Sequence, residues 1–67
     1  MTKNEAISQM KAGKKLTHKW FLDDEWVKTD QRGMIYIFED GVECTSQEFW
    51  HWRTDESWET DWEIFKK

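Results

Sequence analysis

The chain has 67 residues, so it forms a single domain (residues 1–67) with a small core, because a domain of this size buries only about 60% of the surface that its unfolded chain exposes. Its single cysteine, Cys44, excludes an intramolecular disulfide and fits a reducing cytoplasm, where we expect the protein. The sequence shows no apolar run near the ~20 residues of a membrane span and no Cys/His spacing typical of a metal site, so we expect no cofactor.

The net charge of −4 is divided unevenly along the chain. Residues 1–32 carry a net charge of +2 and residues 33–67 a net charge of −6. A protein that binds duplex DNA or RNA needs a basic stripe, and the only basic cluster here, within residues 11–19, is short. Duplex nucleic acid is therefore not an expected partner.

The first predicted element is a helix over residues 3–12. Thr2 and Glu5 have the Thr-x-x-Glu spacing of a capping box, in which each side chain satisfies a backbone N–H of the first turn. Gly13 is a natural end for this helix, because glycine adopts the left-handed conformation at low cost.

An antiparallel meander is predicted next. Residues 15–22 alternate as a strand, residues 25–29 form a short returning strand, and residues 34–38 are the most β-prone run in the chain. Four side chains of the first strand are expected on one face: Leu16, His18, Trp20 and Leu22. The run 34–38 is apolar on both faces, so we expect a central strand covered on both sides. Asp40-Gly41 predicts a hairpin into residues 42–44.

The last third predicts a short helix over residues 47–53, with Thr45 or Ser46 as its N-cap, and a closing strand over residues 62–65. Phe49, Trp52 and Arg53 are expected near one side of the helix. In the strand, Trp62 and Ile64 are expected to face inward and Glu63 outward. The fold class is therefore α+β, with a helix packed on a small antiparallel sheet, a second helix and a closing strand.

Tryptophan is the most informative residue type, because four of the six lie between positions 50 and 62, among Glu and Asp. A small domain cannot easily bury so many indoles. No catalytic set accompanies them: His18, His51 and Cys44 lack partners at a recognisable spacing, so we do not expect an enzyme. Exposed Trp can stack on nucleotide bases, Lys or Arg can meet phosphates, and Asp or Glu can hold ribose hydroxyls. An unusually aromatic core with a dimer seam explains the same residues equally well.

Both ends of the chain resemble a family of small phage-encoded proteins. The similarity lies in residues 5–7, 10–17 and Trp20, in the helix start Ser46-Gln47-Glu48, and in the ending Asp61-Trp62-Glu63-Ile64. The family includes the Thoeris anti-defence sponges, which bind a cyclic ADP-ribose signal without cleaving it. The chain departs from it in a shorter middle and in the Trp-rich segment 49–59.

The resemblance implies a helix on an antiparallel sheet, a homo-oligomer and a phage protein that sequesters a nucleotide immune signal, a cyclic ADP-ribose isomer or a cyclic oligonucleotide, in the host cytoplasm. On this hypothesis the ligand-binding residues are the stacking candidates Trp20, Trp26, Trp50 and Trp52, the phosphate partners Lys14, Lys15 and Arg53, and the ribose acceptor Asp61.

Two alternatives remain open at the level of sequence. One is a small acidic phage inhibitor that binds a host defence or replication protein directly. Exposed Trp50 and Trp58 would then be the main contact residues, with acidic side chains around them. The other is an oligomer without a ligand, in which the tryptophans close the subunit interface.

Overall fold

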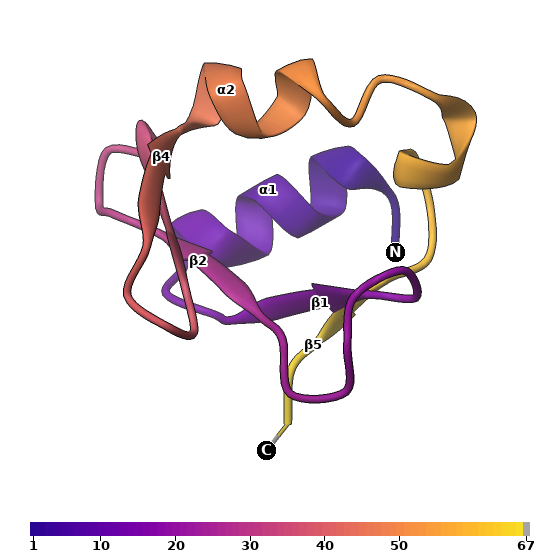
Figure 1. The fold of residues 1–67 in the computed structure, drawn as a ribbon, viewed down its shortest axis with the longest axis horizontal. Helices are drawn as coiled ribbons and strands as arrows, with labels where there is room; N and C mark the ends of the chain where they lie inside the picture. The colour runs from indigo at the N-terminus through magenta and orange to yellow at the C-terminus, as the bar shows by residue number, and fades with distance from the viewer. Residues whose placement is uncertain (67) are drawn as a thin grey trace.

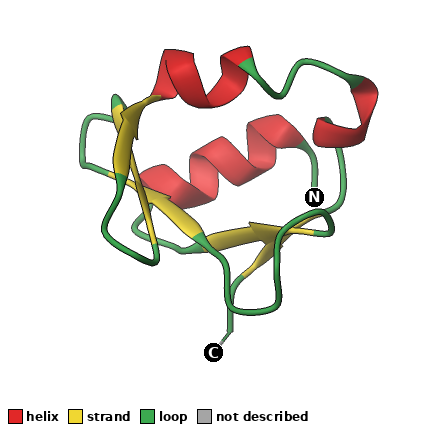
Figure 2. Ribbon diagram, in the orientation of Figure 1, coloured by secondary structure: helices red, strands yellow, loops and turns green. Residues whose placement is uncertain are grey.

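Two α-helices and one 3-10 turn accompany a five-stranded sheet in the computed structural model, which describes residues 1–66 (Figures 1 and 2). The elements are α1 (Lys3–Lys11), β1 (Leu16–His18), β2 (Val27–Thr29), β3 (Ile35–Phe38), β4 (Glu43–Thr45), α2 (Ser46–His51), the 3-10 turn η1 (Glu56–Trp58) and β5 (Trp62–Ile64). The sheet order is β4-β3-β2-β1-β5, and all neighbouring strands are antiparallel. The predicted α+β class is confirmed.

The capping box of α1 forms as predicted. The Thr2 hydroxyl accepts the Glu5 N–H at 3.2 Å, and the Glu5 carboxylate accepts the Thr2 N–H at 2.8 Å. Gly13 follows the helix with a φ of +93°, in the left-handed region. The local sequence signals are therefore sufficient to set both ends of α1, to within one residue of the prediction.

Both helices lie on the same side of the curved sheet (Figure 1). The core lies between the helices and the sheet. Its buried apolar side chains come from both helices and four of the strands: Ala6, Met10, Leu16, Val27, Tyr36, Phe49 and Trp62. Because the helices share one side, no helix within residues 1–66 covers the other face of the sheet.

Trp62 is the largest side chain that the core buries completely. Its indole N–H donates to the Trp58 carbonyl at 2.8 Å, which satisfies the one polar group of the ring. Ile64 packs against the same core, whereas Glu63 between them is exposed. The predicted alternation of the closing strand is confirmed.

The prediction for the first strand is wrong beyond His18. The chain turns there, because the Phe21 N–H donates to the His18 carbonyl at 2.9 Å and the Trp20 N–H donates to His18 Nδ1 at 3.1 Å. The turn breaks the alternation of side chains, so Phe21 packs against the core while Trp20 and Leu22 are 60% and 77% exposed. Leu16 and His18 are buried, as predicted.

The predicted covering of the run 34–38 on both sides is also wrong. In β3 only Tyr36 is buried, and Ile35 and Ile37 are half-buried on the sheet face that lacks a helix. The Asp40-Gly41 hairpin forms as predicted, since the Phe38 N–H donates to the Val42 carbonyl at 2.9 Å.

The second helix is capped by the Thr45 hydroxyl, which accepts the Glu48 N–H at 3.1 Å, as the sequence indicates. It ends at His51, two residues earlier than predicted. Trp52 therefore lies beyond the last helical turn and is 80% exposed, instead of sharing a side with the buried Phe49. Arg53 does reach the Phe49 ring, at 4.0 Å from its centroid.

Candidate functional site

The sheet face that no helix covers carries basic and aromatic side chains. Leu16 of β1 and Val27 of β2 are paired and buried, so the residues that precede them, Lys15 and Trp26, face the opposite side of the sheet. Phe65, directly after β5, joins them there, because its N–H donates to the Lys15 carbonyl at 2.8 Å. Three segments that are far apart in sequence thus meet on one face.

Trp26 is the centre of this group. The Lys15 Nζ lies 4.4 Å and the Lys28 Nζ 5.8 Å from its ring centroid, within the range of a cation–π contact. The Phe65 ring centroid lies 6.4 Å away, with the two planes inclined at 50°. We call Lys15, Trp26, Lys28 and Phe65 the Trp26 platform.

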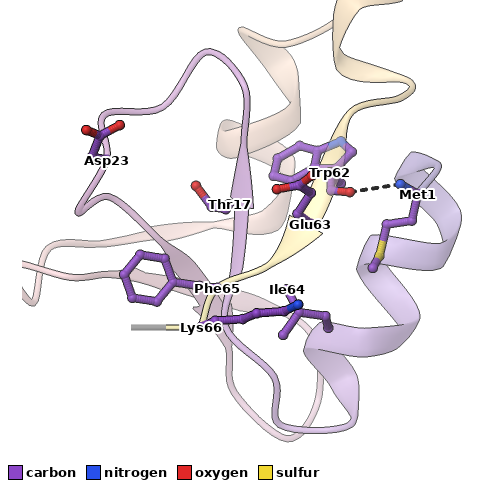
Figure 3. A pocket seen from close by; sticks show the side chains of 8 residues that line it. All are labelled: Met1, Thr17, Asp23, Trp62, Glu63, Ile64, Phe65 and Lys66. Atoms are coloured by element: carbon purple, nitrogen blue, oxygen red, sulfur yellow. Dashed lines mark hydrogen bonds between the residues drawn. The ribbon is translucent and has the colours of Figure 1, made fainter.

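An open groove of about 540 Å³ adjoins the platform and shares Phe65 with it. Figure 3 shows its lining, which comes from β1, β5, the loop before β2 and the first residue: Met1, Thr17, Asp23, Trp62, Glu63, Ile64, Phe65 and Lys66. The volume lies within the roughly 300–1,000 Å³ of small-molecule sites. The lining side chains offer two carboxylates, one ammonium and one hydroxyl, together with two aromatic rings.

Thr17 illustrates how the strand positions one of these groups. Its hydroxyl donates to the Glu25 carbonyl at 3.0 Å, which fixes the side chain at the strand surface. The same oxygen retains acceptor capacity toward a ligand. Glu63 is its partner across the β1–β5 pair, so a hydroxyl and a carboxylate stand side by side at the groove.

Of the eight residues that the sequence singles out, the structure brings two together in this platform, Lys15 and Trp26. Lys14 is exposed in the turn after α1. Trp20 and Trp52 are exposed as well, but one lies in the β1–β2 loop and the other at the end of α2.

Asp61 lies outside the platform, directly before β5 and exposed. Its carboxylate pairs with the Lys19 Nζ at 3.2 Å, and this hydrogen bond lowers the pKa of the Asp61 carboxyl. Its φ of 70° places a non-glycine residue in the left-handed region.

Trp50 is half-buried and held by contacts within the domain. Its indole N–H donates to the Tyr36 hydroxyl at 2.9 Å, and its ring meets Phe49 and Trp62 edge-on at 4.8 and 5.6 Å. The Lys3 Nζ lies 4.6 Å from the ring centroid. These contacts make Trp50 a packing residue, so we leave it out of the candidate site.

Arg53 is likewise engaged inside the fold. Its guanidinium carbon lies 4.0 Å from the Phe49 ring centroid and 5.2 Å from that of Trp58, and Nη1 donates to the Phe49 carbonyl at 3.0 Å. Burial lowers the pKa of the guanidinium. The group is stacked between two rings and is poorly placed to meet a phosphate in solution.

Four residues of the candidate site were not predicted from the sequence: Lys28, Phe65, Thr17 and Glu63. Alternation around the inward-facing Leu16 and Ile64 is the signal that places Thr17, Glu63 and Phe65 on the outer face. It does not show that β1 lies between β2 and β5, and only that strand order brings Lys28, Phe65 and Trp26 together.

Groups suited to nucleophilic or metal chemistry are not gathered elsewhere in residues 1–66. No set of three His, Cys, Asp or Glu side chains there is arranged to hold a metal ion. Cys44 is half-buried, and burial raises the pKa of its thiol, which disfavours the nucleophilic thiolate. No helix in this range has both the length and the apolarity needed to cross a membrane.

Comparison of the chain with protein-family models, with curated proteins and with solved structures gives no match. The Trp26 platform and the groove beside it are therefore interpreted from their own geometry and chemistry.

Proposed function

We propose that the chain is a non-catalytic binding module that holds a nucleotide on the Trp26 platform. The observation that carries the proposal is the placement of two lysine ammonium groups, at 4.4 and 5.8 Å, around one indole on a sheet face without a covering helix. An aromatic ring with adjacent cations fits a ligand that joins a flat base to a phosphate.

The platform binds the base and the phosphate of such a ligand, and the adjoining groove binds its ribose. Trp26 and Phe65 offer ring surface to the base, and stacking contributes roughly 1–3 kcal/mol per base. Lys15 and Lys28 offer charge to the phosphate. The neighbouring Glu63 carboxylate accepts hydrogen bonds from ribose hydroxyls, the role that an acidic residue has in dinucleotide sites. None of these steps requires a bond to be broken.

Sequestration is the activity that follows from binding without cleavage. We propose a signalling nucleotide as the ligand, with the cyclic ADP-ribose isomers and cyclic oligonucleotides first, because the sequence resembles the anti-defence sponges at both ends. Affinity then comes from groups that neighbouring strands bring together, because Lys15, Trp26 and Phe65 each lie directly beside a strand of one sheet.

The test is calorimetry and thermal shift on the full chain with AMP, ADP, cyclic ADP-ribose isomers and cyclic dinucleotides. We expect at least one of them to bind, and Trp26→Ala to weaken it by about 5- to 150-fold, the equivalent of one lost stacking contact. Lys28→Gln should weaken phosphate-bearing ligands more than the matching nucleosides.

Trp52→Ala is the matched control, because this residue is exposed like a binding tryptophan but lies outside the platform. It should leave the affinity unchanged. Absence of binding by every nucleotide in the panel, or an equal loss in the Trp26 and Trp52 variants, would refute the proposal.

A further inference from the structure

The loop that joins β1 to β2 can be followed in Figure 1. It contains two large apolar side chains that are exposed, Trp20 and Leu22. Trp20 is 60% exposed and Leu22 is 77% exposed, although Phe21 between them packs against the core. We call residues 19–25 the Trp20 loop. Two large exposed apolar side chains within three residues make this loop a candidate interaction site.

Hydrogen bonds hold the loop in one conformation. The Trp20 N–H donates to His18 Nδ1 at 3.1 Å, and the Leu22 N–H donates to the Glu25 carboxylate at 3.0 Å. The Glu25 N–H donates in turn to the Leu22 carbonyl at 3.0 Å. A loop that is already ordered loses little conformational entropy on binding, so more of its contact energy appears as affinity.

Buried His18 anchors the loop to the far end of the chain. Its side chain is 3% exposed, and Nε2 lies 2.9 Å from the Ser57 carbonyl and 2.8 Å from the Thr60 carbonyl. Because Nδ1 accepts the Trp20 N–H, the neutral ring carries its proton on Nε2 and donates it to these carbonyls. The ring also stacks on Trp58, with centroids 4.4 Å apart.

A groove of about 290 Å³ runs between the Trp20 loop and β5. Phe21 and Leu22 supply its apolar lining, and carboxylates flank it on both sides: Asp23 in the loop, with Asp61 and Glu63 across from it. Lys19 is the only cation in this lining, and its ammonium is paired with Asp61 at 3.2 Å. The lining of the groove therefore combines two apolar side chains with a net negative charge.

We propose that the Trp20 loop and this groove bind a basic amphipathic segment of another protein, with an apolar stripe flanked by Lys or Arg. The apolar stripe would cover Trp20 and Leu22. The basic side chains would meet Asp23 and Glu63, because the Asp61 carboxylate is paired with Lys19. Charge complementarity selects this partner, because the same carboxylates repel nucleic acid and anionic membranes. The site contains none of the four platform residues, but it shares Asp23 and Glu63 with the groove beside the platform. The peptide is tested without nucleotide, so its binding does not depend on the proposed function.

The experiment uses the full chain and a fluorescent helical peptide of about 14 residues, composed of leucine and lysine with leucines at i, i+3, i+4 and i+7. A matched peptide carries glutamate in place of lysine. Fluorescence anisotropy should show binding of the Leu–Lys peptide alone, weakened by added salt. Leu22→Ser should weaken it at least about tenfold, as expected of a central contact.

Met34→Ser is the control, because Met34 is 57% exposed but lies at the start of β3, outside the loop. It should bind the peptide as the unmodified chain does. Circular dichroism and urea unfolding verify that both variants fold. No binding of the Leu–Lys peptide, equal binding of both peptides, or equal loss in the two variants would overturn the proposal. So would binding to phosphatidylglycerol vesicles with an affinity that Leu22→Ser reduces.

Discussion

Replacement of His18 by phenylalanine tests how the C-terminal segment and the Trp20 loop are held together. The substitution keeps an aromatic ring between Trp58 and Trp62, whose centroids lie 4.4 and 4.8 Å from that of His18. It removes the acceptor of the Trp20 N–H and the donor shared by the Ser57 and Thr60 carbonyls. The change therefore separates hydrogen bonding from ring packing at one position.

The magnitude follows from the number of groups left without a partner. A buried polar group that loses its hydrogen bond costs about 1–3 kcal/mol. Three backbone groups are affected, but the two carbonyls share one donor and lie at a partly buried site. We therefore expect His18→Phe to lower the free energy of unfolding by about 2–4 kcal/mol. Cores of domains this small rarely supply more than about 3–5 kcal/mol, so the variant should be close to unfolding.

The assay is urea unfolding followed by tryptophan fluorescence and by circular dichroism, with coincident transitions as the test of two-state behaviour. His51→Phe is the matched control, because His51 is exposed at the end of α2 and should change the free energy of unfolding by no more than about 0.5 kcal/mol. If His18→Phe is as stable as this control, the hydrogen bonds of His18 do not hold the two segments together, and the account of the rigid Trp20 loop fails.

Two further predictions concern backbone conformation and pH. Asp61→Ala and Asp61→Gly both remove the ion pair with Lys19, so the difference between their free energies of unfolding isolates the cost of the left-handed backbone at a φ of 70°. Urea unfolding should show the alanine variant to be less stable than the glycine variant by about 0.5–1 kcal/mol. Equal stability would contradict a strained backbone at this residue. The carboxyl pKa is lowered in the folded state at four positions: Glu5, Asp30, Asp55 and Asp61. A carboxyl whose pKa is lower in the folded than in the unfolded state stabilises the fold at pH values above its unfolded pKa. This stabilisation is lost as the pH falls through the folded pKa, so the urea midpoint should decrease below about pH 4. Glu5→Gln removes one of these four titrating carboxyls and should make this acid-induced decrease smaller; an unchanged slope would contradict it.

Several elements of the fold can be predicted from the sequence because their signals are local. The Thr2 and Glu5 side chains and Gly13 define α1, Asp40-Gly41 defines the β3–β4 hairpin, and alternation places Trp62 and Ile64 inward. Each of these depends on a hydrogen bond or a conformational preference that spans only a few residues. Such interactions are present in the chain before any long-range contact forms.

Which aromatic residues are buried and which are exposed depends instead on contacts between segments that are distant in the sequence. The first strand ends at His18 because the side chain of His18, fixed by carbonyls about 40 residues away, accepts the Trp20 N–H. Without that turn, Trp20 and Leu22 would continue the inward-facing row that alternation predicts. The same long-range packing holds Trp50 against Tyr36 and leaves Trp52 in solvent.

The Trp26 platform depends on the same kind of information. Lys15 and Trp26 are recognisable as candidates from residue type, but Lys28 and Phe65 join them only because β1 lies between β2 and β5. Strand order is set by the burial of Leu16, Val27 and Trp62 against α1 and α2, a collective effect of the core that no single segment encodes. Residue types thus supply the chemistry of the candidate site, and the packing of the sheet determines which residues share it.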